Sequence, residues 1–140
     1  MSLRIVGVLF ALGLSVSRVS SQTEWQINGE ACSSYQTADA QLNAEYKQIR
    51  TVYSKDAVFL RKLTAAQRAW LTYRDAQLSA LYPADDKQRE YGSMYSTCRC
   101  HALQQLTEQR TKELARWVEG VSEGETCAGS VRHAAEKNPE

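Results

Sequence analysis

The sequence is poor in the residues from which catalytic and metal sites are usually built. Its 140 residues include two histidines, His101 and His133, and seven scattered glycines. These two histidines give no readable Ser–His–Asp arrangement, and the glycines form no phosphate-binding loop. No segment alternates polar and apolar residues for long enough to predict a β-sheet. The sequence therefore indicates a helical protein that is not an enzyme and has no catalytic residues, metal site or cofactor.

The chain also lacks an excess of charge of either sign. It has 17 lysines and arginines against 16 aspartates and glutamates. The first 21 residues hold Arg4 and Arg18 but no acidic residue, so the rest of the chain has 15 basic and 16 acidic groups. A nucleic-acid-binding protein would need a basic stripe. We therefore expect no nucleic-acid partner.

Residues 1–21 have the three parts of a secretory signal peptide. Arg4 gives a positive start, Ile5–Val16 form an apolar run, and Val19–Ser21 are small residues at the expected cleavage site. The run of about 12 residues is too short for a bilayer, which needs roughly 20. No cysteine directly follows the small residues, so we expect no lipid anchor there. Although an N-terminal core helix is the alternative, we expect cleavage after Ser21. A single domain of about 119 residues would then be periplasmic or secreted, with no membrane contact after cleavage.

All four cysteines, Cys32, Cys98, Cys100 and Cys127, follow the predicted signal. An even number of cysteines in an oxidising compartment indicates disulfides. The segment STCRCH (96–101) has one residue between its cysteines, whereas c-type haem attachment needs two; a metal site or a redox pair is the alternative. Positions two apart on a helix point about 200° apart, so Cys98 and Cys100 must reach different elements. We expect one bridge at each end of the chain. The pairing stays open, with Cys32–Cys100 and Cys98–Cys127 slightly favoured.

Apolar side chains recur at helical spacing in three segments. The first segment spans 36–53, the second spans 57–82 without an internal glycine or proline, and the third runs from about 93 to 119. These patterns predict an all-α fold, a small three-helix bundle braced by disulfides. An N-terminal extension (22–35) would precede the helical domain (36–119). An irregular polar tail (120–140) would follow it, tethered only through Cys127.

Capping residues define the expected ends of these helices. Thr37 is a candidate N-cap for the first helix and Asp56 for the second. Pro83 ends the second helix, because the residue before a proline is forced out of helical geometry. Gly120 is a C-terminal stop for the third. The polar segment from Pro83 to Ser93 is then the one substantial loop.

The segment LTAAQRAWLTYRDAQL (63–78) places a polar seam on the second predicted helix. Gln67 and Arg74 share a face, and Trp70 lies one turn before Arg74, so the guanidinium can stack on the indole. Arg110 falls within the apolar stripe of the third helix, where an unpaired charge is costly; Asp75 and Asp39 are its candidate partners. The expected structural polar core comprises Asp39, Gln67, Arg68, Trp70, Arg74, Asp75 and Arg110. A ligand site built from Arg68, Arg74 and Arg110 is the alternative.

Three blocks of the sequence resemble the LprI-like family of exported bacterial proteins. They are ADAQLNAEYKQI (38–49), AQRAWLTYRDA (66–76) and LTEQRTKEL (106–114). The resemblance covers roughly residues 32–118, and the QRxWxxYRD core of the second block is its most specific part. The family often has a cysteine shortly after RDA, where this chain has Leu78; the CRC segment is a candidate replacement. The named inhibitor of the family is a lipoprotein, whereas this chain has no lipid-acceptor cysteine.

The resemblance implies an exported binding protein that inhibits lysozyme or a related glycan hydrolase by protein–protein contact. Lysozyme uses two carboxylates in a cleft, which a rigid protrusion can block. The candidate protrusion is the Pro83–Ser93 loop, whose acidic groups would complement a basic enzyme; a solvated connector is the alternative. A non-inhibitory envelope structural or stress module, which binds another envelope protein or peptidoglycan, is the second hypothesis. The candidate partner-binding residues are Asp85, Asp86, Glu90 and Tyr91.

Overall fold

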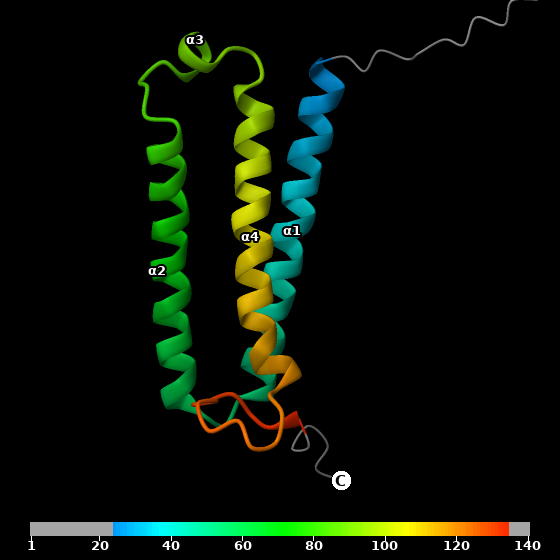
Figure 1. Ribbon diagram of the computed structural model, residues 1–140, viewed down its shortest axis with the longest axis vertical. Helices are drawn as coiled ribbons and strands as arrows, with labels where there is room; N and C mark the ends of the chain where they lie inside the picture. The colour runs from blue at the N-terminus through cyan, green and yellow to red at the C-terminus, as the bar shows by residue number, and fades with distance from the viewer. Residues whose placement is uncertain (1–23, 135–140) are drawn as a thin grey trace, which may run out of the picture.

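The computed structural model describes residues 24–134. The predicted signal peptide and the end of the tail (135–140) lie outside this range. The described part contains four helices, α1 (Glu24–Val52), α2 (Ala57–Leu81), α3 (Lys87–Tyr91) and α4 (Tyr95–Glu119). The three long helices stand side by side, and the short α3 crosses one end between α2 and α4 (Figure 1). The all-α expectation is confirmed.

Helix α1 begins twelve residues before the predicted start at residue 36. Thr37 is therefore not an N-cap: it lies inside the helix, and its hydroxyl donates to the Ser33 carbonyl at 3.1 Å. The added turns have a partner to pack on, because Ala31 is buried and Cys32 is bonded to Cys100 of α4. Tertiary packing thus extends a helix whose local sequence signals begin later.

The ends of α2 and α4 follow the capping signals in the sequence. The Asp56 carboxylate accepts a hydrogen bond from the Phe59 backbone N–H at 2.9 Å, which caps α2. Helix α2 then ends at Leu81, two residues before Pro83. Gly120 ends α4 with φ of 80°, a conformation that favours glycine. These three expectations are confirmed.

The best-packed seam of the fold lies between α1 and α4. Small buried side chains, including Ala31, Ala38 and Thr107, alternate along it with larger ones. Small residues allow two helix backbones to approach closely. The largest fully buried side chains here are aliphatic, and burial of one such side chain contributes roughly 1.5–3 kcal/mol. They are Leu42, Ile49 and Leu114.

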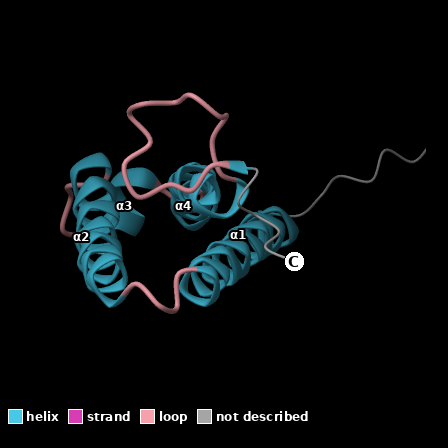
Figure 2. Ribbon diagram, turned by 90° about the horizontal axis from the view of Figure 1, so that it is seen from below, coloured by secondary structure: helices cyan, strands magenta, loops and turns pink. Residues whose placement is uncertain are grey.

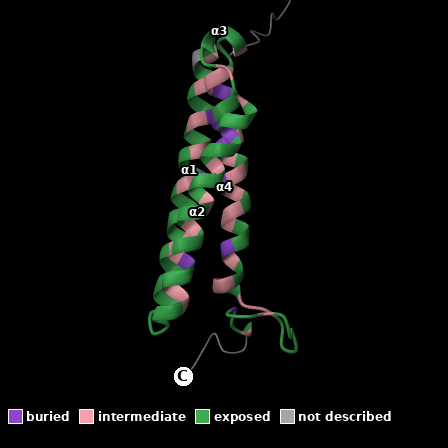
Figure 3. Cartoon of the chain, turned by 90° about the vertical axis from the view of Figure 1, so that its left-hand side faces the viewer, coloured by how far each residue is buried: buried purple, intermediate pink, exposed green. Residues whose placement is uncertain are grey.

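Helix α2 is covered much less than α1 and α4. Seen end-on in Figure 2, α4 lies between α1 and α2. Only Leu63 and Leu78 of α2 are buried, and most of the α2 surface is exposed in Figure 3. Leu81 and Val58 expose 54% and 60% of their surface. Helix α2 therefore leaves apolar surface available for other contacts.

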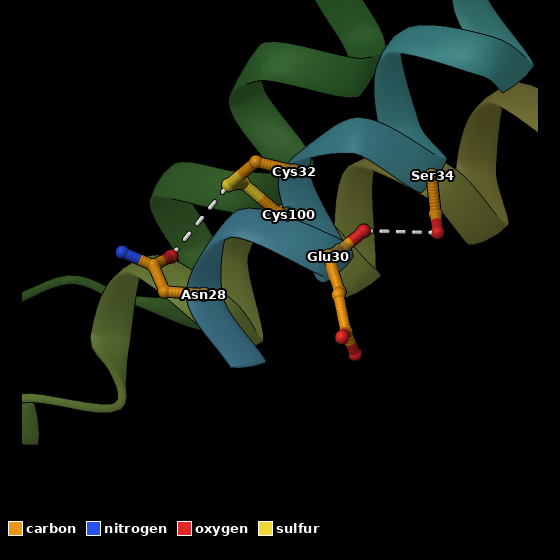
Figure 4. Close-up of a disulfide and its surroundings, with 5 residues drawn as sticks. All are labelled: Asn28, Glu30, Cys32, Ser34 and Cys100. Carbon is orange, nitrogen blue, oxygen red and sulfur yellow. Dashed lines mark hydrogen bonds between the residues drawn. A yellow bond between two sulfur atoms is a disulfide. The ribbon is translucent and has the colours of Figure 1, made fainter. Parts of the chain in front are cut away.

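One of the two expected disulfides is present. Cys32 of α1 is bonded to Cys100 of α4, with the Cα atoms 4.9 Å apart (Figure 4). The prediction of a second bridge is wrong, because Cys98 and Cys127 are free and exposed. Cys98 lies in the first turn of α4 and Cys127 lies beyond its far end. The tail would have to run back along α4 to join them, and it does not.

The chain after α4 forms a closed loop below the helices instead of an open tail. Its two ends meet where Val121 and His133 form an isolated parallel bridge. The Arg132 backbone N–H donates to the Tyr53 hydroxyl at 3.1 Å, and the Arg132 guanidinium lies 4.4 Å from the Tyr53 ring centroid. Trp117 Nε1 donates to the hydroxyl of Ser130 at 3.1 Å. The prediction of a tether through Cys127 alone is therefore wrong.

Candidate partner-binding site

The connector between α2 and α4 (residues 82–95, here called the apical cap) forms one end of the molecule (Figure 1). It contains α3 and is therefore more ordered than the loop expected over residues 83–93. The Asp86 carboxylate starts α3 by accepting a hydrogen bond from the Arg89 backbone N–H at 3.0 Å. Gly92 ends α3 with φ of 70°. A polar connector thus becomes a compact turn of defined shape.

Three tyrosine rings hold the apical cap together. Tyr82 contacts Tyr91 and Tyr95 edge to face, with centroids 5.3 and 5.2 Å apart, and Tyr91 stacks on Tyr95 at 6.0 Å. Such pairs contribute about 0.5–1.5 kcal/mol each beyond their burial. The Tyr91 hydroxyl also accepts a hydrogen bond from the Ala84 backbone N–H at 3.1 Å, and Lys87 Nζ donates to the Ala84 carbonyl at 2.6 Å. The cap is therefore braced from inside.

The tyrosine cluster also affects an ionisable group. Burial raises the pKa of the Tyr82 hydroxyl above its usual value, and the neighbouring Cys98, Tyr95 and Tyr91 raise this pKa further. Cys98 lies three residues after Tyr95, in the first turn of α4, and therefore close to the base of the cap. The cap thus joins a free thiol and three phenols at one end of α4.

The four residues predicted for partner binding all lie in the cap, but their roles differ. Asp85 and Glu90 have exposed side chains and can accept hydrogen bonds from another molecule. Asp86 is used as the N-cap of α3, and Tyr91 is half-buried in the ring cluster. Two residues therefore offer a contact surface, and the other two maintain its shape.

Of the residues predicted to form a polar core, only Arg110 and Gln67 contact each other between α2 and α4. Arg110 Nε donates to Gln67 Oε1 of α2 at 3.1 Å, and its Nη1 lies 3.0 Å from a carboxylate oxygen of Glu113. The prediction of Asp39 or Asp75 as its partner is wrong. Asp39 instead accepts a hydrogen bond from the Asn43 side chain at 3.0 Å. Glu113 lies one turn away on the same helix and so reaches Arg110 at little conformational cost.

The stacking predicted for Arg74 is present. Its guanidinium carbon lies 5.6 Å from the Trp70 ring centroid, and its Nη2 forms a salt bridge of 2.8 Å with Asp75. Arg68 is exposed and lies six positions from Arg74, about 240° around the helix. Arg68 and Arg74 therefore point in different directions. Because Arg74 and Arg110 already have partners, the three arginines do not form one ligand site.

Sequence reasoning missed the two tyrosines that complete the cap. Tyr82 and Tyr95 flank the polar connector on either side. A signal for them was available, because three tyrosines at the two ends of one short connector must come close when the flanking helices are antiparallel. Sequence reasoning also missed Glu113 as the partner of Arg110, although side chains three positions apart on a helix are close enough to pair.

A comparison with protein-family models identifies the family of this chain. A family model described as lysozyme inhibitor LprI matches residues 17–114, more than half of the chain, and the match includes α2, the apical cap and most of α4. Within residues 24–134, no helix is both long and apolar enough to cross a bilayer. No curated protein and no solved structure matches the chain. On the strength of the family match, this chain belongs to the LprI family of lysozyme inhibitors.

Proposed function

We propose that this chain is an exported protein that binds lysozyme, or a related glycan hydrolase, and blocks its cleft with the apical cap. The observation that carries the proposal is the family match over residues 17–114, which contains the entire cap. Export is supported by the signal-like N-terminus and would bring the chain to the compartment where lysozyme attacks a cell wall. The protein acts by contact and performs no chemistry itself.

The shape of the cap supports its use as an inhibitory protrusion. It lies at one end of an elongated molecule, the end that also holds the first turns of α1 (Figure 1). The ring cluster of Tyr82, Tyr91 and Tyr95 and the capped α3 hold it in one conformation before binding. A preorganised loop loses less conformational entropy when it binds than a flexible loop does.

The charges of the cap support the same partner. Asp85 and Glu90 present exposed carboxylates, and the ammonium of Lys87 is held by the Ala84 carbonyl. With Asp86 and the exposed Arg89, the cap has three acidic and two basic side chains, an excess of one negative charge. Acidic groups favour association with a basic enzyme and increase the rate of encounter. In lysozyme-type hydrolysis one catalytic carboxyl stays protonated as the general acid. A carboxylate of the cap can accept a hydrogen bond from that group and occupy the place of the substrate.

A cell-wall lysis assay with a c-type lysozyme tests the proposal. The secreted, purified chain should slow lysis in proportion to its concentration. The double variant Asp85→Asn/Glu90→Gln removes the two exposed carboxylates that do not cap α3, with little change in shape, and leaves Asp86 as the α3 N-cap. We expect it to weaken inhibition by about tenfold, mainly through slower association.

A matched control distinguishes the effect of the cap carboxylates on inhibition from the effect of the overall charge of the protein. Glu30→Gln/Glu123→Gln also removes two exposed carboxylates, from α1 and from the C-terminal loop. This control should inhibit like the unaltered chain. Equal weakening by both double variants would show that only net charge matters. Complete lysis at a large molar excess of the chain would instead favour a non-inhibitory envelope protein.

A further inference from the structure

A pocket lies where α1 ends and α2 begins, at the opposite end of the molecule from the apical cap (Figure 1). This pocket, here called the basal pocket, is open to solvent and has a volume of about 570 Å³. None of the residues that line it is acidic. They are Tyr46, Lys47, Arg50, Thr51, Ser54 and Leu60. The proposed contact with lysozyme leaves the basal pocket unused.

Positive charge is concentrated around the basal pocket. Residues 46–62 contain five basic side chains and one acidic side chain, whereas basic and acidic groups nearly balance in the whole chain. The acidic residue, Asp56, is used as the N-cap of α2. Glu45 lies two positions before Lys47, about 200° around α1, and so points to the other side of the helix. In the described part of the chain, neither Lys47 nor Arg50 forms a salt bridge, so both charges can attract an anion.

Three hydrogen-bond donors reach the basal pocket from one side of the chain. Arg50 follows Lys47 by three positions and Ser54 follows Arg50 by four, so the three side chains lie along one stripe. The Thr51 hydroxyl already donates to the Lys47 carbonyl at 3.2 Å. The Ser54 hydroxyl forms no hydrogen bond with any described residue. An ammonium, a guanidinium and a hydroxyl can therefore donate to three separate acceptor atoms.

A tyrosine fixes the wall of the basal pocket and one of its cations. The Thr64 hydroxyl donates to the Leu60 carbonyl at 2.8 Å, so in its 3.0 Å contact with the Tyr46 hydroxyl it accepts. This bond joins α1 to α2 and holds the Tyr46 ring in place. The Arg50 guanidinium carbon lies 5.9 Å from the centroid of that ring. A cation held in position before binding loses less side-chain entropy when it meets its ligand.

We propose that the basal pocket binds a phosphate monoester, whose three terminal oxygens accept hydrogen bonds from Lys47, Arg50 and Ser54. A phosphate monoester carries close to two negative charges at neutral pH, which match the two cations of the pocket. A carboxylate has one charge and two oxygens, and it would leave one of the three donors unused. The Tyr46 ring and Leu60 provide apolar surface for the carbon atoms of the ester. This inference does not depend on lysozyme being the target, because the cap lies at the other end of the molecule.

A nuclear magnetic resonance titration of the purified secreted chain with glycerol 3-phosphate tests the proposal. We expect saturable shifts of the backbone amides in residues 46–54. Lys47→Gln/Arg50→Gln should weaken binding at least about tenfold, because it removes two hydrogen bonds to a charged group. Arg68→Gln/Lys112→Gln is the matched control, since it removes two exposed cations that do not line the basal pocket. This control should bind like the unaltered chain.

Two outcomes of this titration would overturn the proposal. The first is the absence of saturable shifts in residues 46–54, or equal weakening by the two double variants. The second concerns a purely structural role, because cations near the end of α1 also stabilise the helix by interacting with its dipole. In that case Lys47→Gln/Arg50→Gln would lower the melting temperature and still bind glycerol 3-phosphate as tightly as the unaltered chain.

Two further probes define the chemistry of the ligand. Glycerate has a carboxylate in place of the phosphate and should bind more weakly than glycerol 3-phosphate; equal affinity would contradict the match of three donors to three oxygens. Vesicles of equimolar phosphatidylcholine and phosphatidic acid present the same monoester on a lipid. Sedimentation of the chain with these vesicles, abolished in Lys47→Gln/Arg50→Gln and retained in the control, would identify a lipid headgroup as a source. Binding of glycerol 3-phosphate without such sedimentation would identify a soluble ester.

Discussion

Removal of the Cys32–Cys100 bridge should destabilise the protein mainly through its unfolded state. The bridge closes a chain segment with a sequence separation of 68. The loop-entropy relation converts a closed loop of this length into about 4 kcal/mol at 25 °C. For a chain of about 119 residues, this corresponds to a decrease in Tm of about 15 °C. The double variant Cys32→Ala/Cys100→Ala should therefore remain helical at room temperature but unfold far earlier in urea.

Urea titration followed by circular dichroism measures this loss as a difference in unfolding free energy. Cys127→Ala is the control, because its thiol is free and exposed; it should unfold like the unaltered chain. The bonded cysteines join α1 to the start of α4, just below the cap. A loss of less than about 1 kcal/mol would refute the reasoning, because the unfolded chain would then gain little freedom from the missing bridge.

Three smaller perturbations test other contacts. Arg110→Ala should lower the unfolding free energy by about 1–2 kcal/mol, because it removes bonds to Gln67 and Glu113 at a partly solvated site; an unaltered urea midpoint would contradict this. Gly120→Ala should cost about 1 kcal/mol more than Gly124→Ala, since both glycines have positive φ but only at Gly120 would a Cβ atom lie 2.8 Å from the Arg132 carbonyl; equal urea midpoints would count against the closed C-terminal loop. The raised pKa of Tyr82 means that the folded state holds its phenolic proton more tightly than the unfolded state. This contribution to stability is complete below the unfolded pKa of about 10 and is lost as pH rises through the folded pKa. Urea midpoints measured against pH should therefore fall more steeply above pH 10 in the unaltered chain than in Tyr82→Phe, and parallel curves would rule the effect out.

The parts of the fold that could be predicted from the sequence depend on local signals. Asp56 and Pro83 defined the ends of α2 because capping and proline geometry act within a few residues. The early start of α1 could not be predicted in this way, since it depends on packing against α4 and on the Cys32–Cys100 bond. The helix around Thr37 therefore follows tertiary contact rather than its local cap signal.

The wrong predictions have separate physical causes. The Cys98–Cys127 pairing assumed an extended tail, but contacts of Arg132 and Trp117 fold the chain back below the helices. The assignment of Arg110 to a distant aspartate overlooked that a carboxylate three residues away is reached with less loss of side-chain freedom. For the cap, the sequence indicated which residues lie there. Only the three-dimensional arrangement shows that Asp85 is exposed for contact, whereas Tyr91 packs inside the cap and maintains its shape.

The central claim, that the apical cap is the surface that engages lysozyme, is tested most directly by amide hydrogen exchange. Exchange should be compared for the chain alone and for the chain mixed with an excess of c-type lysozyme. The account predicts that protection on binding is concentrated in residues 82–95, with little change in α1 or in the loop after α4. Protection confined to those other regions, or no change anywhere at saturating lysozyme, would contradict it.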